Sequence, residues 1–415
     1  MSVIATWPAV GPVNQSMGGA GTALPLDALG ALHWNPASIT GLRSSEFGFG
    51  AMVFAPVTEL SSTIDANAFG PGFPPTTLSG STGSDTDVSP IPSFGFVSKE
   101  VDSPWAFGLG GFAIGGFGVD FPLTPTNPIV TPQPADGGVG FGPIFSEFQL
   151  MQFCPTVALR TGSGWSFGVA PTVNWATLAV SPFSAAAPDS AGRYSPGASS
   201  DAVWGLGFQV GAFYDDADTP WDFGVSYKSK QRFQEFAINS FDSDGSPRVL
   251  HMQLDYPSIL SLGLAYSGFA RTRIACDVRH IDYEGTEGFQ AAGFGPDGAV
   301  TGFGWSSIWA AAIGVEYDVT DRLRWRVGYS FNESPIDGQS IFFNSPAPAL
   351  IQHHLSTGFT KEIGDCWDFS MAAKVGFENS VSGPWHAPGF GAVPDTDVRA
   401  SLATYGLSFG VSKRF

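Results

Sequence analysis

The sequence is poor in charge, since Asp, Glu, Lys and Arg make up 13% of its 415 residues, against about 25% in a typical soluble domain. Bases are scarcest, and 19 Lys and Arg against 37 Asp and Glu leave a net charge of −18. Low charge with 14% aromatic residues excludes a disordered chain, because disordered chains carry many charges and few aromatic side chains. The acidic balance argues against nucleic-acid binding, because phosphate would be repelled.

Cysteine is also scarce. Cys154, Cys276 and Cys366 lie far apart and form no CxxC pair, so neither a zinc site nor a disulfide framework is indicated. The phosphate-binding pattern GxxxxGK[ST] is absent as well. We therefore expect no metal and no cofactor.

Long apolar runs are missing. A membrane-spanning helix needs about 20 consecutive apolar residues, and the nearest candidate, residues 103–119, contains six glycines. The first residues, MSVIATWPAV, lack the basic region and apolar run of a signal peptide. Either the protein is not exported, or its signal has already been removed, and the strand pattern favours removal.

Apolar and polar residues alternate with a period of two from about residue 45 onward. Within residues 367–378, Trp367, Phe369 and Met371 fall on one face, and Ser370 and Lys374 fall on the other. Residues 221–233 and 323–331 repeat this pattern, with aromatic side chains on the apolar face. Such alternation predicts strands with one apolar and one polar face.

The connections between these strands are of two kinds that alternate strictly. Six short turns lie at residues 101–104, 162–164, 215–220, 268–271, 320–322 and 364–366. Seven longer loops lie at residues 56–90, 121–147, 181–202, 237–250, 285–304, 334–350 and 380–397. Short turns at one end and long loops at the other are typical of outer-membrane barrels. We predict an all-β fold, a 14-stranded antiparallel transmembrane β-barrel in the outer membrane of a Gram-negative bacterium.

The end of the chain supports this prediction. Tyr405, Leu407, Phe409, Val411 and the terminal Phe415 share one face, which resembles the C-terminal signature of outer-membrane barrels, although Lys413 interrupts the pattern. The acidic loops are compatible with a lipopolysaccharide surface bridged by divalent cations. They are equally compatible with a role in solubility alone.

The first 44 residues do not alternate, and they contain small residues and a short apolar helical stretch at residues 26–34. A segment this short is expected to pack inside the barrel lumen, where protein and water satisfy irregular backbone. The sequence thus predicts an N-terminal plug at residues 1–44 and a barrel at residues 45–415.

The plug carries a family resemblance. A glycine cluster (Gly18, Gly19, Gly21), then Asp27-Ala28, then Asn35-Pro36-Ala37 resembles the hatch of the FadL-type transporters of long-chain fatty acids and hydrocarbons. In architecture the resemblance extends over the whole chain. It implies a monomeric barrel that takes up a hydrophobic molecule passively, by loop capture, an interior apolar site and lateral exit at a kink in the third strand.

The third predicted strand, residues 105–120, is rich in glycine at Gly110, Gly111, Gly115 and Gly116. Glycine within a strand marks bulges and sharp bends, so these residues are the candidates for the lateral-exit kink. The alternative is that glycine only makes room for the plug.

Apolar residues in two loops and in the third strand are the candidates for substrate binding. Exposed apolar clusters in loops commonly mark binding sites, although loops that pack on one another to cap the barrel would show the same composition. The candidates are Phe112, Phe117, Phe141, Ile144, Phe145, Phe342 and Phe343.

Lys228, Arg279 and Arg326 fall on the polar, lumenal face and are candidate partners for a carboxylate, which favours Arg or Lys. Alternatively, they pair with inward acids such as Asp277 and Glu316, because barrel interiors are polar. The sequence leaves open whether the substrate is a fatty acid or a neutral hydrocarbon.

No catalytic pattern is evident. The six histidines form no HExxH motif, and no GxSxG elbow is present, so we expect no enzymatic activity. A general outer-membrane porin, which would lack the plug, is the main alternative, and an outer-membrane enzyme is less favoured.

Overall fold

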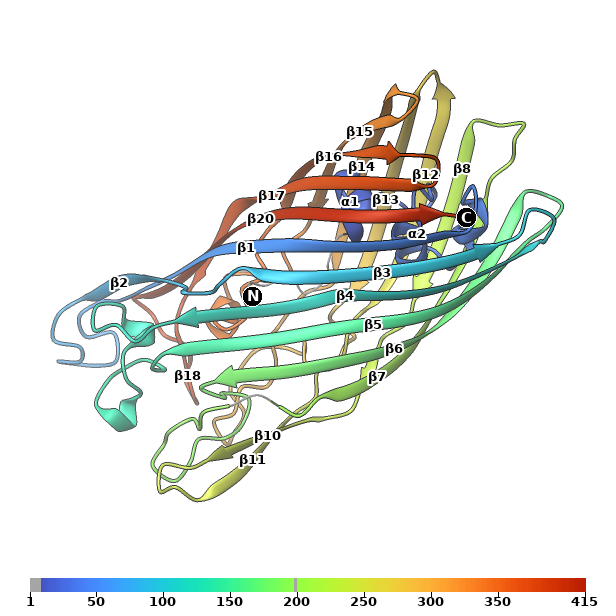
Figure 1. Cartoon of the computed structure of the whole chain (residues 1–415). Helices are drawn as coiled ribbons and strands as arrows, with labels where there is room; N and C mark the ends of the chain where they lie inside the picture. Colours follow the sequence, from blue (N-terminus) through green and yellow to red (C-terminus); the bar gives the residue numbers. More distant parts are fainter. Residues whose placement is uncertain (1–8, 198–199) are drawn as a thin grey trace.

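The computed structural model describes residues 9–197 and 200–415. These residues form a closed antiparallel β-barrel with a small helical segment in its interior (Figure 1). No helix among them is long and apolar enough to cross a bilayer.

Fourteen strands of the described residues make up the barrel wall, as predicted. They are β1 (Glu46–Ile64), β3 (Ser89–Lys99), β4 (Trp105–Phe121), β5 (Ile144–Arg160), β6 (Trp165–Ser181), β7 (Val203–Tyr214), β8 (Trp221–Lys228), β12 (Ser258–Phe269), β13 (Thr272–Asp282), β14 (Ile308–Thr320), β15 (Leu323–Asn332), β16 (His353–Ile363), β17 (Trp367–Gly383) and β20 (Thr396–Arg414). The last strand pairs with the first from Glu46↔Arg414 to Ile64↔Thr396, which closes the barrel.

Short turns gather at one end of the barrel and long loops at the other, as Figure 1 shows. Both ends of the wall lie at the turn end, where the amide of Phe415 donates to the carbonyl of Ser45 at 3.0 Å. The loops carry further elements: β2 (Leu78–Gly83), β9 (Arg232–Phe233), β10 (Phe236–Phe241), β11 (Pro247–Met252), β18 (His386–Ala387), β19 (Gly391–Ala392) and the 3-10 helices η2 (Pro128–Val130), η3 (Pro134–Asp136) and η4 (Ile341–Asn344).

Two loops differ from their predicted extents. The expected loop at residues 56–90 is partly strand, because β1 continues to Ile64 and pairs there with β2, with Leu60 and Ile64 fully buried on its inner face. The expected loop at residues 237–250 is part of a longer connection, residues 229–257, which contains the β10–β11 hairpin.

The alternation places aromatic side chains outside and polar ones inside. In β15, Trp325 is 52% exposed and its neighbour Arg326 only 1%. In β8, Phe223 and Tyr227 are exposed, whereas Lys228 is buried. The outer face is therefore apolar and suited to lipid, which is typical of outer-membrane barrels.

The plug consists of α1 (Gly11–Ser16), α2 (Ala28–Trp34) and the 3-10 helix η1 (Pro36–Gly41). Asp27 caps α2 by accepting a hydrogen bond from the amide of Gly30 at 3.0 Å. Every residue of α1 and α2 is buried, because the barrel wall surrounds both helices. These helices are too short to be stable alone in water, so their packing inside the wall maintains them.

Candidate functional site

One carboxylate of the barrel wall holds the plug in place. Oδ2 of Asp277, on β13, accepts hydrogen bonds from the amides of Gly21 and Thr22 at 2.9 and 3.0 Å and from the Thr22 hydroxyl at 2.9 Å. Arg279, two residues later, forms an ion pair with Asp277 and lies over the Trp34 ring at 3.4 Å from its centroid. A buried carboxylate oxygen with three hydrogen bonds and an ion pair fixes the position of the plug strongly.

The predicted hatch residues shape this plug. Gly18 and Gly19 have positive φ values of 68° and 89°, which favour glycine. A side chain at Gly18 would also collide with the backbone of Tyr329 in the wall. The Asn35 amide group donates to the carbonyls of Thr22 and Ala212 at 2.9 and 3.1 Å, and its oxygen accepts from the amide of Ala37.

The wall is interrupted between β3 and β4. Pairing between these strands ends at Ser93↔Phe112, and the next contact on that side is the amide of Asp85 donating to the carbonyl of Asp120 at 2.8 Å. Within the described residues, the backbone at 114–119 has a strand partner only on the β5 side. We call this interruption the strand break.

Two sequence features accompany the strand break. The register of β4 with β5 shifts between Ala113 and Gly115, so Ile114 is an extra, bulged residue. On the other side, Pro90 and Pro92 of β3 lack the N–H groups that a ladder with β4 would need. Proline within the neighbouring strand is a sequence signal for such an interruption, and our prediction, which used only the glycines, did not include it.

The four candidate kink glycines separate into two pairs. Gly115 and Gly116 lie directly after the bulge, in the half of β4 without a β3 partner. Gly110 and Gly111 lie in the paired half, where side chains would collide with the rings of Phe112 and Phe94. The latter pair is therefore required by packing.

Three cavities lie in series from the loop end toward the strand break. The outer cavity, about 440 Å³, is formed by the long loops and lined by Phe141, Tyr194, Phe294, Phe342 and Trp385 among others. A small connecting cavity, about 20 Å³, is lined by Phe141, Ile144, Phe342 and Phe343. The inner cavity, about 270 Å³, is lined by Phe117, Phe183, Phe303 and Phe343 and by polar residues that include Gln253, Glu287 and Gln290. Cavities of several hundred Å³ lined by aromatic residues are typical of small-molecule sites.

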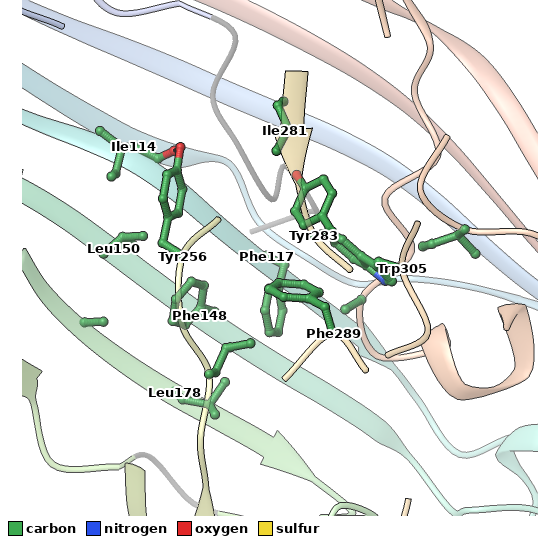
Figure 2. Packing of buried hydrophobic residues seen from close by; sticks show 14 of the residues in the cluster. Ile114, Phe117, Phe148, Leu150, Leu178, Tyr256, Ile281, Tyr283, Phe289 and Trp305 are labelled. Atoms are coloured by element: carbon green, nitrogen blue, oxygen red, sulfur yellow. The ribbon is translucent and has the colours of Figure 1, made fainter. Parts of the chain in front are cut away.

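Aromatic side chains fill the lumen beside the inner cavity, as Figure 2 shows. Phe117 of β4 stacks on Phe148 of β5 with 5.2 Å between the ring centroids. From the loop after β13, Phe289 and Trp305 pack on each other at 4.9 Å. Loop residues therefore meet strand residues deep in the barrel.

The structure distributes the predicted binding residues unevenly. Five of the seven line at least one of the three cavities: Phe117, Phe141, Ile144, Phe342 and Phe343. Phe112 packs instead on the plug, edge-on to His33 at 5.5 Å. Phe145 lies on the outward face of β5, 36% exposed, and lines none of the three cavities.

The loops also pack on one another, as the alternative interpretation required. The indole N–H of Trp305 donates to Oδ1 of Asn344 at 2.6 Å, and Nδ2 of Asn344 donates to the carbonyl of Phe303 at 2.7 Å. These bonds join η4, which carries Phe342 and Phe343, to the loop after β13. Capping and cavity formation therefore use the same residues.

The three candidate carboxylate partners are already engaged. Arg279 pairs with Asp277 and Arg326 with Glu316, and Nζ of Lys228 donates to Oε1 of Gln152 at 3.0 Å. Among the lysines and arginines on inward-facing strand positions of the described chain, only Lys374 lacks both an ion pair and a hydrogen bond.

The outer cavity is uncharged at neutral pH. Burial raises the pKa of the Tyr194 phenol to about 12, and Asp297 nearby adds to this rise. Burial lowers the pKa of His386, in the same cavity, below its usual value, so its ring is neutral. Among the described residues, no lysine or arginine lines either large cavity.

Several lining residues lie outside the two loops we selected from the sequence. Phe303 comes from residues 285–304, Trp385 from residues 380–397 and Phe183 from residues 181–202. The aromatic residues in these three loops were the sequence signal that could have identified them as lining residues. Nothing in the sequence indicated that the loops would converge.

A family model described as "Outer membrane protein transport protein (OMPP1/FadL/TodX)" matches residues 9–347 of the chain. No curated relative matches it by sequence.

Solved structures similar to the chain share its architecture. The Pseudomonas putida toluene transporter TodX has a TM-score of 0.71 at 17% identity, covering 98% of this chain and 99% of that one. A Pseudomonas aeruginosa FadL homologue has a TM-score of 0.74 at 17% identity, with both chains covered completely at 100%. The Ralstonia pickettii toluene transporter TbuX has a TM-score of 0.66 at 17% identity, covering 98% and 99%.

Proposed function

The chain belongs to the OMPP1/FadL/TodX family of outer membrane transport proteins, and from this premise we propose how it carries a hydrophobic molecule inward. The substrate enters the outer cavity between the loops, passes to the inner cavity, and leaves sideways through the strand break. Transport is passive, and the barrel acts as a monomer, because pairing of β20 with β1 closes the wall within one chain.

The lining residues that neighbouring cavities share are the observation that carries this proposal. Phe342 lines the outer and connecting cavities, and Phe343 lines the connecting and inner cavities. Phe117 lines the inner cavity and belongs to β4, three residues after the bulged Ile114. A molecule that follows these three phenylalanines moves from the loops to the strand break.

Partitioning supplies the driving force. Transfer of apolar surface from water stabilises the bound substrate by about 0.8 kcal/mol per buried CH₂ group. A molecule that moves down its concentration gradient through apolar cavities needs no other energy source.

Neutral compounds are the proposed substrate class. A carboxylate buried beside the uncharged lining of the outer cavity would lose hydration without gaining a charged partner. TodX and TbuX, two of the structurally similar proteins, are described as toluene transporters. We therefore choose monoaromatic hydrocarbons as the probe substrates for this protein.

Hydrophobic carboxylates are the second candidate, and Lys374 favours them. This half-buried lysine on β17 is the one inward-facing strand cation of the described residues without a partner. Gly406 lies opposite Lys374 in β20 and adds no side chain around it. A carboxylate that travelled as far as the lumen would find an available cation there.

Uptake assays in cells that lack endogenous channels of this family distinguish the two candidates. We expect uptake of radiolabelled toluene, and Lys374→Met leaves it unchanged because no charge is involved. Uptake of radiolabelled oleate that disappears in Lys374→Met would instead identify carboxylates as the substrates. Failure to take up either compound, with folded barrel in the membrane, would refute the proposed function.

A further inference from the structure

The bulged residue of the strand break has an unusual partner. The carbonyl of Ile114 lies outside the regular ladder, and the hydroxyl of Tyr256 donates to it at 3.5 Å. Both side chains are buried, Ile114 completely and Tyr256 with 4% exposure. In Figure 2 the phenol oxygen of Tyr256 points toward Ile114.

Tyr256 belongs to the connection at residues 229–257, which is anchored to β6, two strands away from β4 in the wall. Its amide and carbonyl form a two-way backbone bridge with Gln231 at 3.1 and 3.0 Å. The Gln231 side chain is fully buried, and its oxygen accepts hydrogen bonds from Thr172 at 2.5 Å and Asn174 at 2.7 Å. These bonds fix the backbone of Tyr256, so a rotation of its side chain would not require the loop to move.

The same segment borders the inner cavity. Met252 and Gln253, just before Tyr256, line that cavity together with Phe117. Figure 2 shows the Tyr256 ring between Ile114 and Phe148. Tyr256 thus occupies the lumenal side of the strand break, next to the cavity from which substrate would leave.

We propose that Tyr256 is the gate of the lateral exit. In the closed state its ring covers the strand break from inside, and its hydroxyl holds the ring there through the Ile114 carbonyl. Substrate in the inner cavity reaches the break only when the ring turns aside. This inference rests on the proposed lateral exit, and it assigns control of that exit to one side chain.

Two substitutions separate the roles of the hydroxyl and the ring. Tyr256→Phe removes the hydrogen bond and keeps the ring, so we expect toluene uptake to accelerate by about two- to tenfold, the effect of one net hydrogen bond. Tyr256→Ala removes the ring as well and should give faster uptake still, with less ligand retained by the purified protein. Ligand retention is measured by native mass spectrometry after loading with toluene.

The matched control is Tyr405→Phe and Tyr405→Ala, because Tyr405 lies on the lipid-facing side of β20 and is 50% exposed. Heat-modifiable gel migration verifies that each variant is a folded barrel. Both Tyr256 variants matching the wild type in uptake and retention, or both slowing uptake, would overturn the gate.

Failure of the gate and failure of the proposed function give different results. If the wild type takes up neither toluene nor oleate, the proposed function fails. If the wild type takes up toluene and both Tyr256 variants match it, the lateral exit stands and only the gate is rejected.

Discussion

Asp277 is a side chain of the barrel wall that holds the plug in position. One of its oxygens accepts three hydrogen bonds from the Gly21–Thr22 turn, and its charge neutralises Arg279, which is 5% exposed. Removal of one partner from a buried ion pair costs about 3–5 kcal/mol, because the other charge remains buried and uncompensated.

We therefore expect Asp277→Asn to loosen the plug and leave the barrel wall intact. The wall keeps its β1–β20 closure, which does not involve Asp277. In planar bilayers the variant should show frequent conductance openings that the wild type lacks. Heat-modifiable migration checks that the barrel is folded.

The control is Asp321→Asn, which disrupts the Arg271–Asp321 pair at the turn end. Both side chains of this pair are largely exposed, at 51% and 95%, and such pairs contribute little. If the folded Asp277→Asn barrel shows no more conductance openings than the Asp321→Asn barrel, other contacts hold the plug.

At the scale of single elements, the two halves of β4 differ in their strand pairing. Its first half is paired on both sides, and its second half, after Ile114, is paired only with β5. The glycines predicted the irregularity, but they did not reveal that Pro90 and Pro92 of the neighbouring strand contribute to it. Interruption of a ladder depends on both strands, so one strand's sequence predicts it incompletely.

Replacement of both Gly115 and Gly116 by Val tests the role of the strand break. Branched side chains favour extended, paired backbone and occupy space at the break. We expect toluene uptake to fall by about tenfold, equivalent to about 1.4 kcal/mol on the barrier.

Ala373→Val is the control, because it adds the same branched group on the exposed face of β17. Uptake in the double glycine variant equal to that in Ala373→Val would remove the case for lateral exit at β4.

On the scale of the whole molecule, the lumen is filled rather than open. The apolar core runs from Leu29 and Leu32 of the plug through Phe117 and Phe148 to Phe342 in the loops. A general porin needs a water-filled passage through its barrel. The packed lumen therefore separates this barrel from the porin alternative.

We expect proteoliposomes that contain the wild type to exclude arabinose and to accumulate toluene. The measurement is osmotic swelling in arabinose, compared with protein-free liposomes, alongside toluene uptake by the same preparation. Swelling at the rate of a general porin would contradict the packed lumen and favour the porin alternative.

The sequence by itself determined the barrel and its plug. The number of strands and the lipid-facing side of each strand follow from the alternation. The end of the barrel at which each connection lies follows from its length. Both are local properties of the chain. The N-terminal segment was recognisable because it alone lacked alternation. The alternation of apolar and polar residues also correctly placed Arg326 on the lumenal face of its strand, where it is buried.

Only the tertiary structure decided which residues line the cavities and which inward-facing charges are paired. Phe117, Phe303 and Phe343 come from one strand and two separate loops, and they line one cavity only because the folded barrel brings them together. Arg279 and Arg326 looked available in the sequence and are held by Asp277 and Glu316 in the fold. Tyr256 had no sequence signal at all, because its partner Ile114 lies 142 residues away. Contacts between residues so far apart are set by closure of the barrel, and local patterns carry no information about them.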